Sequence, residues 1–187
     1  MAKRLAWAAI ALMVAAAPLA SHAGYNRELK KQTRSGRIYH PNTWDAEIIW
    51  RATFFDDAFR EEFKKRHQKI KHLNEIGAER FEMEQANRHL NGWDFFVAIY
   101  TKDEYKNFSH YEDTFWHIEL RPAGGEAVKP ILVEKLPITP YEKRMFPYID
   151  RWSQGYRVTF PKVDLGGEFD LTIKSVVGSS TLEWNMR

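Results

Sequence analysis

One short stretch of the sequence holds side chains of the kinds that bind divalent metal ions; these are His110, Glu112, Asp113 and His117. Imidazole and carboxylate groups are ligands that zinc and similar ions accept. His117, however, belongs to a predicted strand, on the face opposite Trp116, whereas His110 precedes that strand. Because the intervening loop would have to fold back to join the two histidines, we expect solvated polar side chains here and no metal site.

Acid–base chemistry of the glycosidase type needs two carboxylates, which come from distant positions in the sequence. No pattern identifies such a pair among the 25 acidic residues. The acids within Asp164–Asp170 lack the spacing of a calcium loop and are typical of a glycine turn. His67, His72 and His89 are expected on the surface of a helical segment. The sequence lacks serine-elbow, phosphate-loop and zinc-protease motifs. We therefore expect no cofactor and a non-enzymatic protein; the alternative is an exported hydrolase whose site is assembled from dispersed carboxylates or histidines.

An aromatic stretch before residues 156–160 is the strongest candidate for a binding surface. Prolines at positions 137, 140 and 147 argue against a regular helix or central strand, so we predict a long crossover loop over Met145–Trp152. The loop could cap one end of the fold, or it could display aromatic rings beside arginines, which is typical of protein interfaces. The predicted binding residues are Arg144, Met145, Phe146, Tyr148, Arg151 and Trp152.

The first 23 residues have the pattern of a secretory signal peptide. Lys3 and Arg4 precede an apolar run of about 16 residues, which is shorter than the roughly 20 that span a bilayer. Ser21 and Ala23 occupy the small-residue positions of a cleavage site. We expect Sec-type cleavage near Ala23 and export to the periplasm or the medium; the alternative is a retained membrane anchor.

The composition narrows the classes of function that the mature chain could have. Cleavage would leave 164 residues with a formal charge of +1, enough for one domain but a poor match to nucleic acid. The absence of cysteine excludes a disulfide scaffold, a thiolate zinc site and a cysteine nucleophile, and with the signal it favours a bacterial envelope. No mature segment is apolar enough to span a membrane. The expected partner is another envelope protein.

The elements that must position these residues are mostly short alternating strands. They are predicted at residues 45–55, 94–101, 114–121, 131–136, 156–160, 169–175 and 181–186. The turn at Gly124-Gly125 predicts a hairpin between the third and fourth of these strands, and Gly178-Ser179 predicts a final hairpin. Trp50, Trp116 and Trp184 are expected in the core. The pattern indicates a mainly β, single-domain antiparallel two-sheet sandwich.

The end of the chain carries a resemblance to a known architecture. The sequence "GYRVTF", followed by a turn and a paired hairpin, is similar to the end of immunoglobulin-like sandwiches. The resemblance covers roughly the last 30 residues and implies an architecture without implying a function.

Two further segments flank the first predicted strand. Residues 57–90 are expected to be a helical insertion, because apolar side chains recur there at helical spacing and Asp56 can cap the first turn. Residues 24–43 form a basic segment with a single acid, Glu28. We expect a solvated tail that becomes ordered near Tyr39, with a segment lying along the domain as the alternative. The sandwich domain itself is expected over residues 44–187.

Overall fold

The computed structural model describes residues 24–102 and 115–186. The predicted signal peptide and three of the metal-type residues, His110, Glu112 and Asp113, lie outside these ranges. In the described part of the chain, the elements are a helix over residues 24–32, β1 (Thr33–Tyr39), β2 (Ala46–Phe54), α2 (Asp57–Lys71), α3 (Glu75–Asn91), β3 (Trp93–Thr101), β4 (His117–Pro122), β5 (Leu132–Leu136), α4 (Pro140–Met145), β6 (Gln154–Phe160), β7 (Glu168–Ser175) and β8 (Gly178–Asn185).

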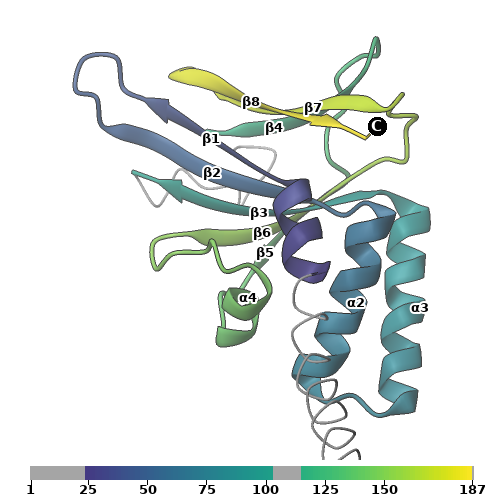
Figure 1. Ribbon diagram of the computed structural model, residues 1–187. Helices are drawn as coiled ribbons and strands as arrows, with labels where there is room; N and C mark the ends of the chain where they lie inside the picture. Colours follow the sequence, from purple (N-terminus) through teal and green to yellow (C-terminus); the bar gives the residue numbers. More distant parts are fainter. Residues whose placement is uncertain (1–23, 103–114, 187) are drawn as a thin grey trace, which may run out of the picture.

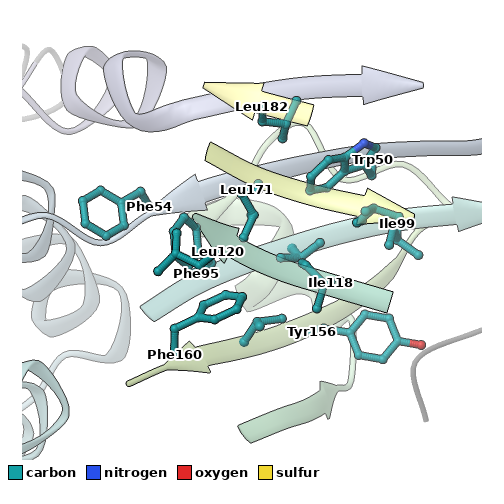
Figure 2. Packing of buried hydrophobic residues seen from close by; sticks show 14 of the residues in the cluster. Trp50, Phe54, Phe95, Ile99, Ile118, Leu120, Tyr156, Phe160, Leu171 and Leu182 are labelled. Atoms are coloured by element: carbon teal, nitrogen blue, oxygen red, sulfur yellow. The ribbon is translucent and has the colours of Figure 1, made fainter. Parts of the chain in front are cut away.

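The strands form two antiparallel sheets that pack face to face, which confirms a mainly β, sandwich-like fold. One sheet has the order β1-β2-β3-β6-β5 and the other the order β4-β7-β8. Alternate side chains of both sheets fill the space between them, including Phe54, Phe95 and Leu171 (Figure 2). The three predicted core tryptophans are buried, with exposed fractions of 0, 1 and 3% for Trp50, Trp116 and Trp184.

The two sheets approach most closely where β1 lies beside β8, although they remain separate in their hydrogen-bonded ladders. A Cβ atom built on Gly36 would lie 2.4 Å from Oγ of Ser180, so a larger residue would push the sheets apart. The Trp50 indole donates to the same Ser180 hydroxyl over 3.1 Å. These contacts join one sheet to the other without closing a barrel.

The five-stranded sheet is covered on its other face by the helices, so the fold has three layers (Figure 1). The central strand β3 is apolar on both sides, because Phe95 faces the sandwich and Phe96 faces the helices. A second hydrophobic cluster fills this helix–sheet interface and includes Phe59, Phe63 and Phe146. None of the helices in the described ranges is both long and apolar enough to cross a bilayer.

Two sequence-based predictions about the strands were wrong. The predicted hairpin around Gly124-Gly125 does not form, since β4 pairs with β7 and β5 pairs with β6. The glycines do make a turn, and Leu120 bridges Val128, but the chain then crosses to the other sheet. β1 was also missed. Its residues are half-exposed or exposed apart from Ile38, and this edge position weakens the alternation on which the prediction relied.

The helical predictions also need correction in two places. The helices α2 and α3 fill the expected insertion, but residues 24–32 are helical as well, and the burial of Tyr25 and Leu29 anchors them to the domain. The basic segment is therefore an integral part of the fold and not a solvated tail. α4 begins at Pro140, which is the first helical position and loses no hydrogen bond there.

Candidate functional site

The outer face of the five-stranded sheet, which carries the helices, brings distant residues into one row. The strand registers place Thr53 opposite Phe96, Phe96 opposite Arg157, and Arg157 opposite Glu134. Apolar and charged side chains therefore lie side by side beneath α2, α3 and α4. These side chains form the apolar centre and the polar rim of a cavity.

A cavity of about 250 Å³ lies between these helices and the sheet. We call it the helix–sheet cavity. It is lined by Phe55, Phe63, His67, Phe81, Glu84, Gln85, Arg88, Asp94, Phe95, Phe96, Leu136, Tyr141, Glu142, Phe146 and Arg157.

The apolar wall of the cavity is a chain of stacked rings. Phe96 and Phe146 stack with ring centroids 3.8 Å apart and planes 4° apart. His67 and Phe81 stack in the same way, at 3.7 Å and 7°. Phe63 lies between the two pairs, with its centroid 6.3 Å from that of Phe146 and 6.2 Å from that of Phe81. Rigid rings on α2, α3, β3 and the segment after α4 therefore present a continuous apolar surface.

A polar pair interrupts this wall at one point. Nδ1 of His67 is hydrogen-bonded to the Tyr141 hydroxyl, which joins α2 to α4. Burial, followed by the charge of Lys71, lowers the pKa of His67, so its neutral form is favoured. Burial also raises the pKa of Tyr141 and keeps the phenol protonated. The pair can therefore orient a ligand by hydrogen bonding without carrying charge.

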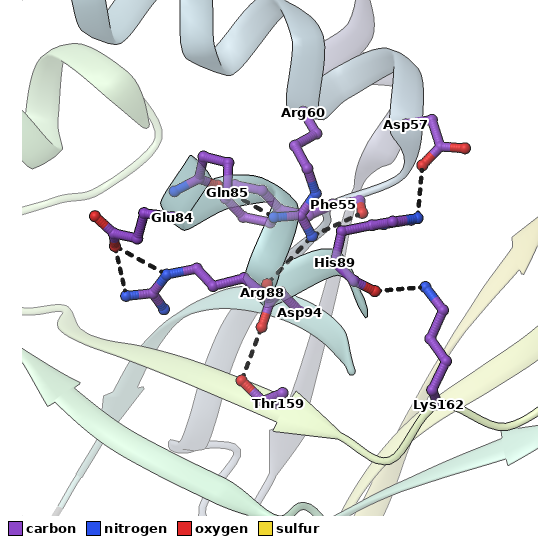
Figure 3. Close-up of polar contacts among 10 residues, drawn as sticks. All are labelled: Phe55, Asp57, Arg60, Glu84, Gln85, Arg88, His89, Asp94, Thr159 and Lys162. Carbon is purple, nitrogen blue, oxygen red and sulfur yellow. Dashed lines mark hydrogen bonds and ion pairs between the residues drawn. The ribbon is translucent and has the colours of Figure 1, made fainter. Parts of the chain in front are cut away.

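A buried ionic network lies beside the cavity and shares Gln85 and Asp94 with its lining (Figure 3). Arg60 of α2 donates to the Asp94 carboxylate over 3.1 Å, and both side chains are 6% exposed. Arg60 also donates to Gln85 of α3 over 3.1 Å, while Thr159 of β6 donates to Asp94 over 2.8 Å. Burial lowers the pKa of Arg60 and the charge of Asp94 opposes this effect. The network joins α2, α3, β3 and β6.

The rim carries two further arginines, each paired with a carboxylate. Arg88 donates to Glu84 one turn earlier in α3 over 2.8 Å (Figure 3). Arg157 donates to Glu134 over 3.0 Å. Burial lowers the pKa of Arg157, and the charge of Arg88 adds to this effect. The cationic groups of the lining are therefore balanced by the protein's own carboxylates.

The three carboxylates that line the cavity are all held by structural partners. Glu84 accepts from Arg88, Asp94 accepts from Arg60 and Thr159, and Glu142 accepts from the Thr139 backbone in the capping box of α4. A general base must be free to reach a substrate proton. Each carboxylate of the lining therefore already serves a contact within the fold.

The structure separates the six residues predicted to form one binding surface. Met145 and Phe146 are buried at 0 and 4% exposure, and only Phe146 lines the cavity. Tyr148 is hydrogen-bonded to Thr53 and lines a different groove. Trp152 is 63% exposed and carries the guanidinium of its neighbour, Arg151, above its ring. Arg144 is also exposed. Their role in binding a partner stays a prediction.

Several cavity residues were not predicted from the sequence. His67 was expected on the surface, yet it is half-buried in the wall of the cavity. Phe59, Phe63 and His67 follow one another at intervals of four, which places His67 on the buried stripe of α2. That spacing could have identified His67; no comparable signal exists for the sheet residue Arg157.

A metal site is likewise not supported by the described residues. Between residues 24 and 102 and between 115 and 186, no cluster of three or more histidines and acids could hold a metal ion. His117 is exposed on β4. No family model, curated protein or solved structure matches this chain. The helix–sheet cavity therefore stands on its geometry alone.

Proposed function

We propose that this protein is an exported, non-enzymatic binding module, built on a sandwich of immunoglobulin-like type, that holds a small uncharged aromatic molecule in the helix–sheet cavity. The observation that carries the proposal is the cavity of about 250 Å³ walled by stacked rings. An apolar cavity of about 150 Å³ is enough to hold benzene, so this one suits a substituted or two-ring aromatic ligand.

The charge balance of the lining supports an uncharged ligand. The lining arginines Arg88 and Arg157 are each paired with a glutamate, and the lining carboxylate Asp94 is paired with the buried Arg60. A charged ligand would lose its hydration on entry without finding an uncompensated partner, which is costly. A neutral ligand loses little hydration and gains contact with the rings. The His67–Tyr141 pair can then supply a hydrogen bond for orientation.

Export is supported by the basic start and apolar run of residues 1–23 together with the position of Gly24. A Cβ atom built on Gly24 would lie 2.9 Å from Oε2 of Glu62. Cleavage after Ala23 would create a charged α-ammonium group on Gly24, the residue that this carboxylate approaches. The two charges would then attract each other.

Indole tests the proposed function, because it is neutral, aromatic and carries one hydrogen-bond donor. We expect calorimetry to show saturable binding of indole, and weaker binding of indole-3-carboxylate, which differs by a charged group. Leu136→Trp should block binding, since Leu136 lines the cavity. Leu132→Trp is the matched control, because Leu132 lies on the same strand and is 46% exposed.

Three results would contradict the proposed function. The first is the absence of binding by indole and by similar neutral aromatics. The second is equal loss of binding in the Leu136→Trp and Leu132→Trp proteins when both keep the wild-type circular dichroism. The third is turnover of aromatic esters that disappears in the His67→Gln protein, which would support the hydrolase alternative instead.

A further inference from the structure

A second hollow of about 490 Å³ lies on another part of the surface, between the helix at residues 24–32, strands β1 and β2, and the segment after α4. We call it the basic groove. It is lined by Asn26, Leu29, Lys30, Thr33, Arg34, Ser35, Arg51, Pro147 and Tyr148.

The basic groove carries positive charge without a matching carboxylate in its lining. Lys30, Arg34 and Arg51 come from the helix, β1 and β2 respectively, and no acidic residue is among the described residues that line the groove. The groove therefore differs from the helix–sheet cavity, where each lining arginine has its own glutamate.

The two arginines are held in place by main-chain carbonyl groups, which carry no net charge. Arg34 donates to the carbonyl oxygens of Lys31 and Glu183 over 2.7 and 2.9 Å. Arg51 donates to the carbonyl oxygen of Tyr148 over 2.7 Å. Their positions are therefore fixed by hydrogen bonds while their charges stay available to a partner.

The remaining lining residues suit a polypeptide better than a small ion. Asn26 and Ser35 are exposed and can hydrogen-bond to a peptide backbone. Leu29 and Tyr148 add an apolar surface for side-chain stems. Charges that come from three elements match several spaced carboxylates better than one compact anion. Because Leu29 is buried and Tyr148 half-buried, neither projects far enough to insert into a bilayer.

We infer that the basic groove docks an acidic peptide segment of a partner protein. The partner would be held by carboxylates facing Lys30, Arg34 and Arg51. This assignment does not depend on ligand binding in the helix–sheet cavity.

The test uses the full-length mature protein and a fluorescein-labelled peptide of alternating glutamate and alanine, with the glutamine–alanine peptide as the neutral comparison. We expect fluorescence anisotropy to show binding of the acidic peptide alone. Raising the ionic strength from about 0.03 to 0.3 M should weaken it. The double variant Lys30→Gln with Arg51→Gln should weaken binding of the acidic peptide by about tenfold or more. The control Lys129→Gln with Lys135→Gln removes two exposed cations elsewhere and should leave it unchanged.

The design separates docking from a loss of structure. Lys30→Glu alone keeps the Arg51 hydrogen bond to Tyr148, so it should weaken binding without lowering the melting temperature. Binding of both peptides alike, or equal weakening in the Lys129/Lys135 control, would overturn the inference. So would binding to phosphatidylglycerol vesicles that depends on Lys30 when the peptide does not bind, since the groove would then serve a membrane surface.

Discussion

Arg60 of α2 and Asp94 of β3 form an ion pair of 3.1 Å although they lie 34 positions apart in the sequence, and each side chain is only 6% exposed. Asp94→Leu would leave the buried guanidinium of Arg60 without its partner. We expect unfolding free energies measured in urea to fall by about 3–5 kcal/mol, because an unpaired buried charge is strongly destabilising.

The double variant Arg60→Met with Asp94→Leu is the matched control for that experiment. It removes both charges and should recover most of the loss. Glu134→Gln breaks the more exposed pair with Arg157 and should cost less than about 1 kcal/mol. Equal losses in the single and double Asp94 variants would show that packing, and not the unpaired charge, sets the stability there.

The pKa of His67 predicts a dependence of stability on pH. Burial and Lys71 lower this pKa from its ordinary value of 6.5, so the unfolded chain takes up the proton more readily than the folded protein. The contribution to stability is therefore complete above about pH 6.5 and is lost as the pH falls through and below that value. His67→Gln should reduce the slope of stability against pH between about 5 and 7.

His89 should change the stability with pH in the same direction, since burial and Lys162 also lower its pKa. The double variant His67→Gln with His89→Gln should therefore have a flatter profile than either single variant. Chemical denaturation at a series of pH values measures this directly. An unchanged slope in the His67→Gln protein would mean that its imidazole does not titrate differently in the folded and unfolded states.

Trp116 tests the sandwich core. It is 1% exposed between the two sheets, and Trp116→Ala should lower the unfolding free energy by about 3–5 kcal/mol, as large-to-small core changes do. Trp152→Ala removes an indole that is 63% exposed and should change stability by less than about 1 kcal/mol. Comparable losses in the two proteins, measured by thermal unfolding, would contradict the burial of Trp116.

Processing after Ala23 is the fourth prediction. Mass spectrometry of the exported protein should give a chain that begins at Gly24, whose new ammonium group can pair with Glu62. Glu62→Gln should then lower the melting temperature of the mature chain slightly and have less effect when an extra N-terminal residue moves the amine away. An exported protein that retains Met1 would contradict cleavage and support a membrane anchor.

The strands could be predicted from the sequence more reliably than their partners. Alternation identifies β2 and β7, and a continuous apolar run identifies β3, because these strands bury one or both faces. Alternation contains no information on which strand lies beside which, so the crossing of the chain between β4 and β5 was missed. Three nearby prolines argue against a helix at α4, whereas Pro140 occupies the first helical position, where proline is tolerated.

The helix–sheet cavity could not be predicted because its walls come from distant parts of the chain. Phe63, Phe81, Phe96 and Phe146 belong to two helices, a central strand and the segment after α4. Each ring has an ordinary place in a hydrophobic pattern, and only the tertiary packing leaves a space between them. Of the predicted aromatic stretch, Phe146 lines the cavity while Trp152 lies on the surface.

The most direct test of the proposed function is to locate bound indole by nuclear magnetic resonance. With phenylalanine labelled in ¹³C and indole unlabelled, intermolecular Overhauser effects report which rings lie next to the ligand. We predict cross-peaks from indole to Phe63, Phe81 and Phe146, and their loss in the Leu136→Trp protein. The absence of cross-peaks to these rings at saturating indole, or cross-peaks that persist unchanged in Leu136→Trp, would contradict a ligand site in the helix–sheet cavity.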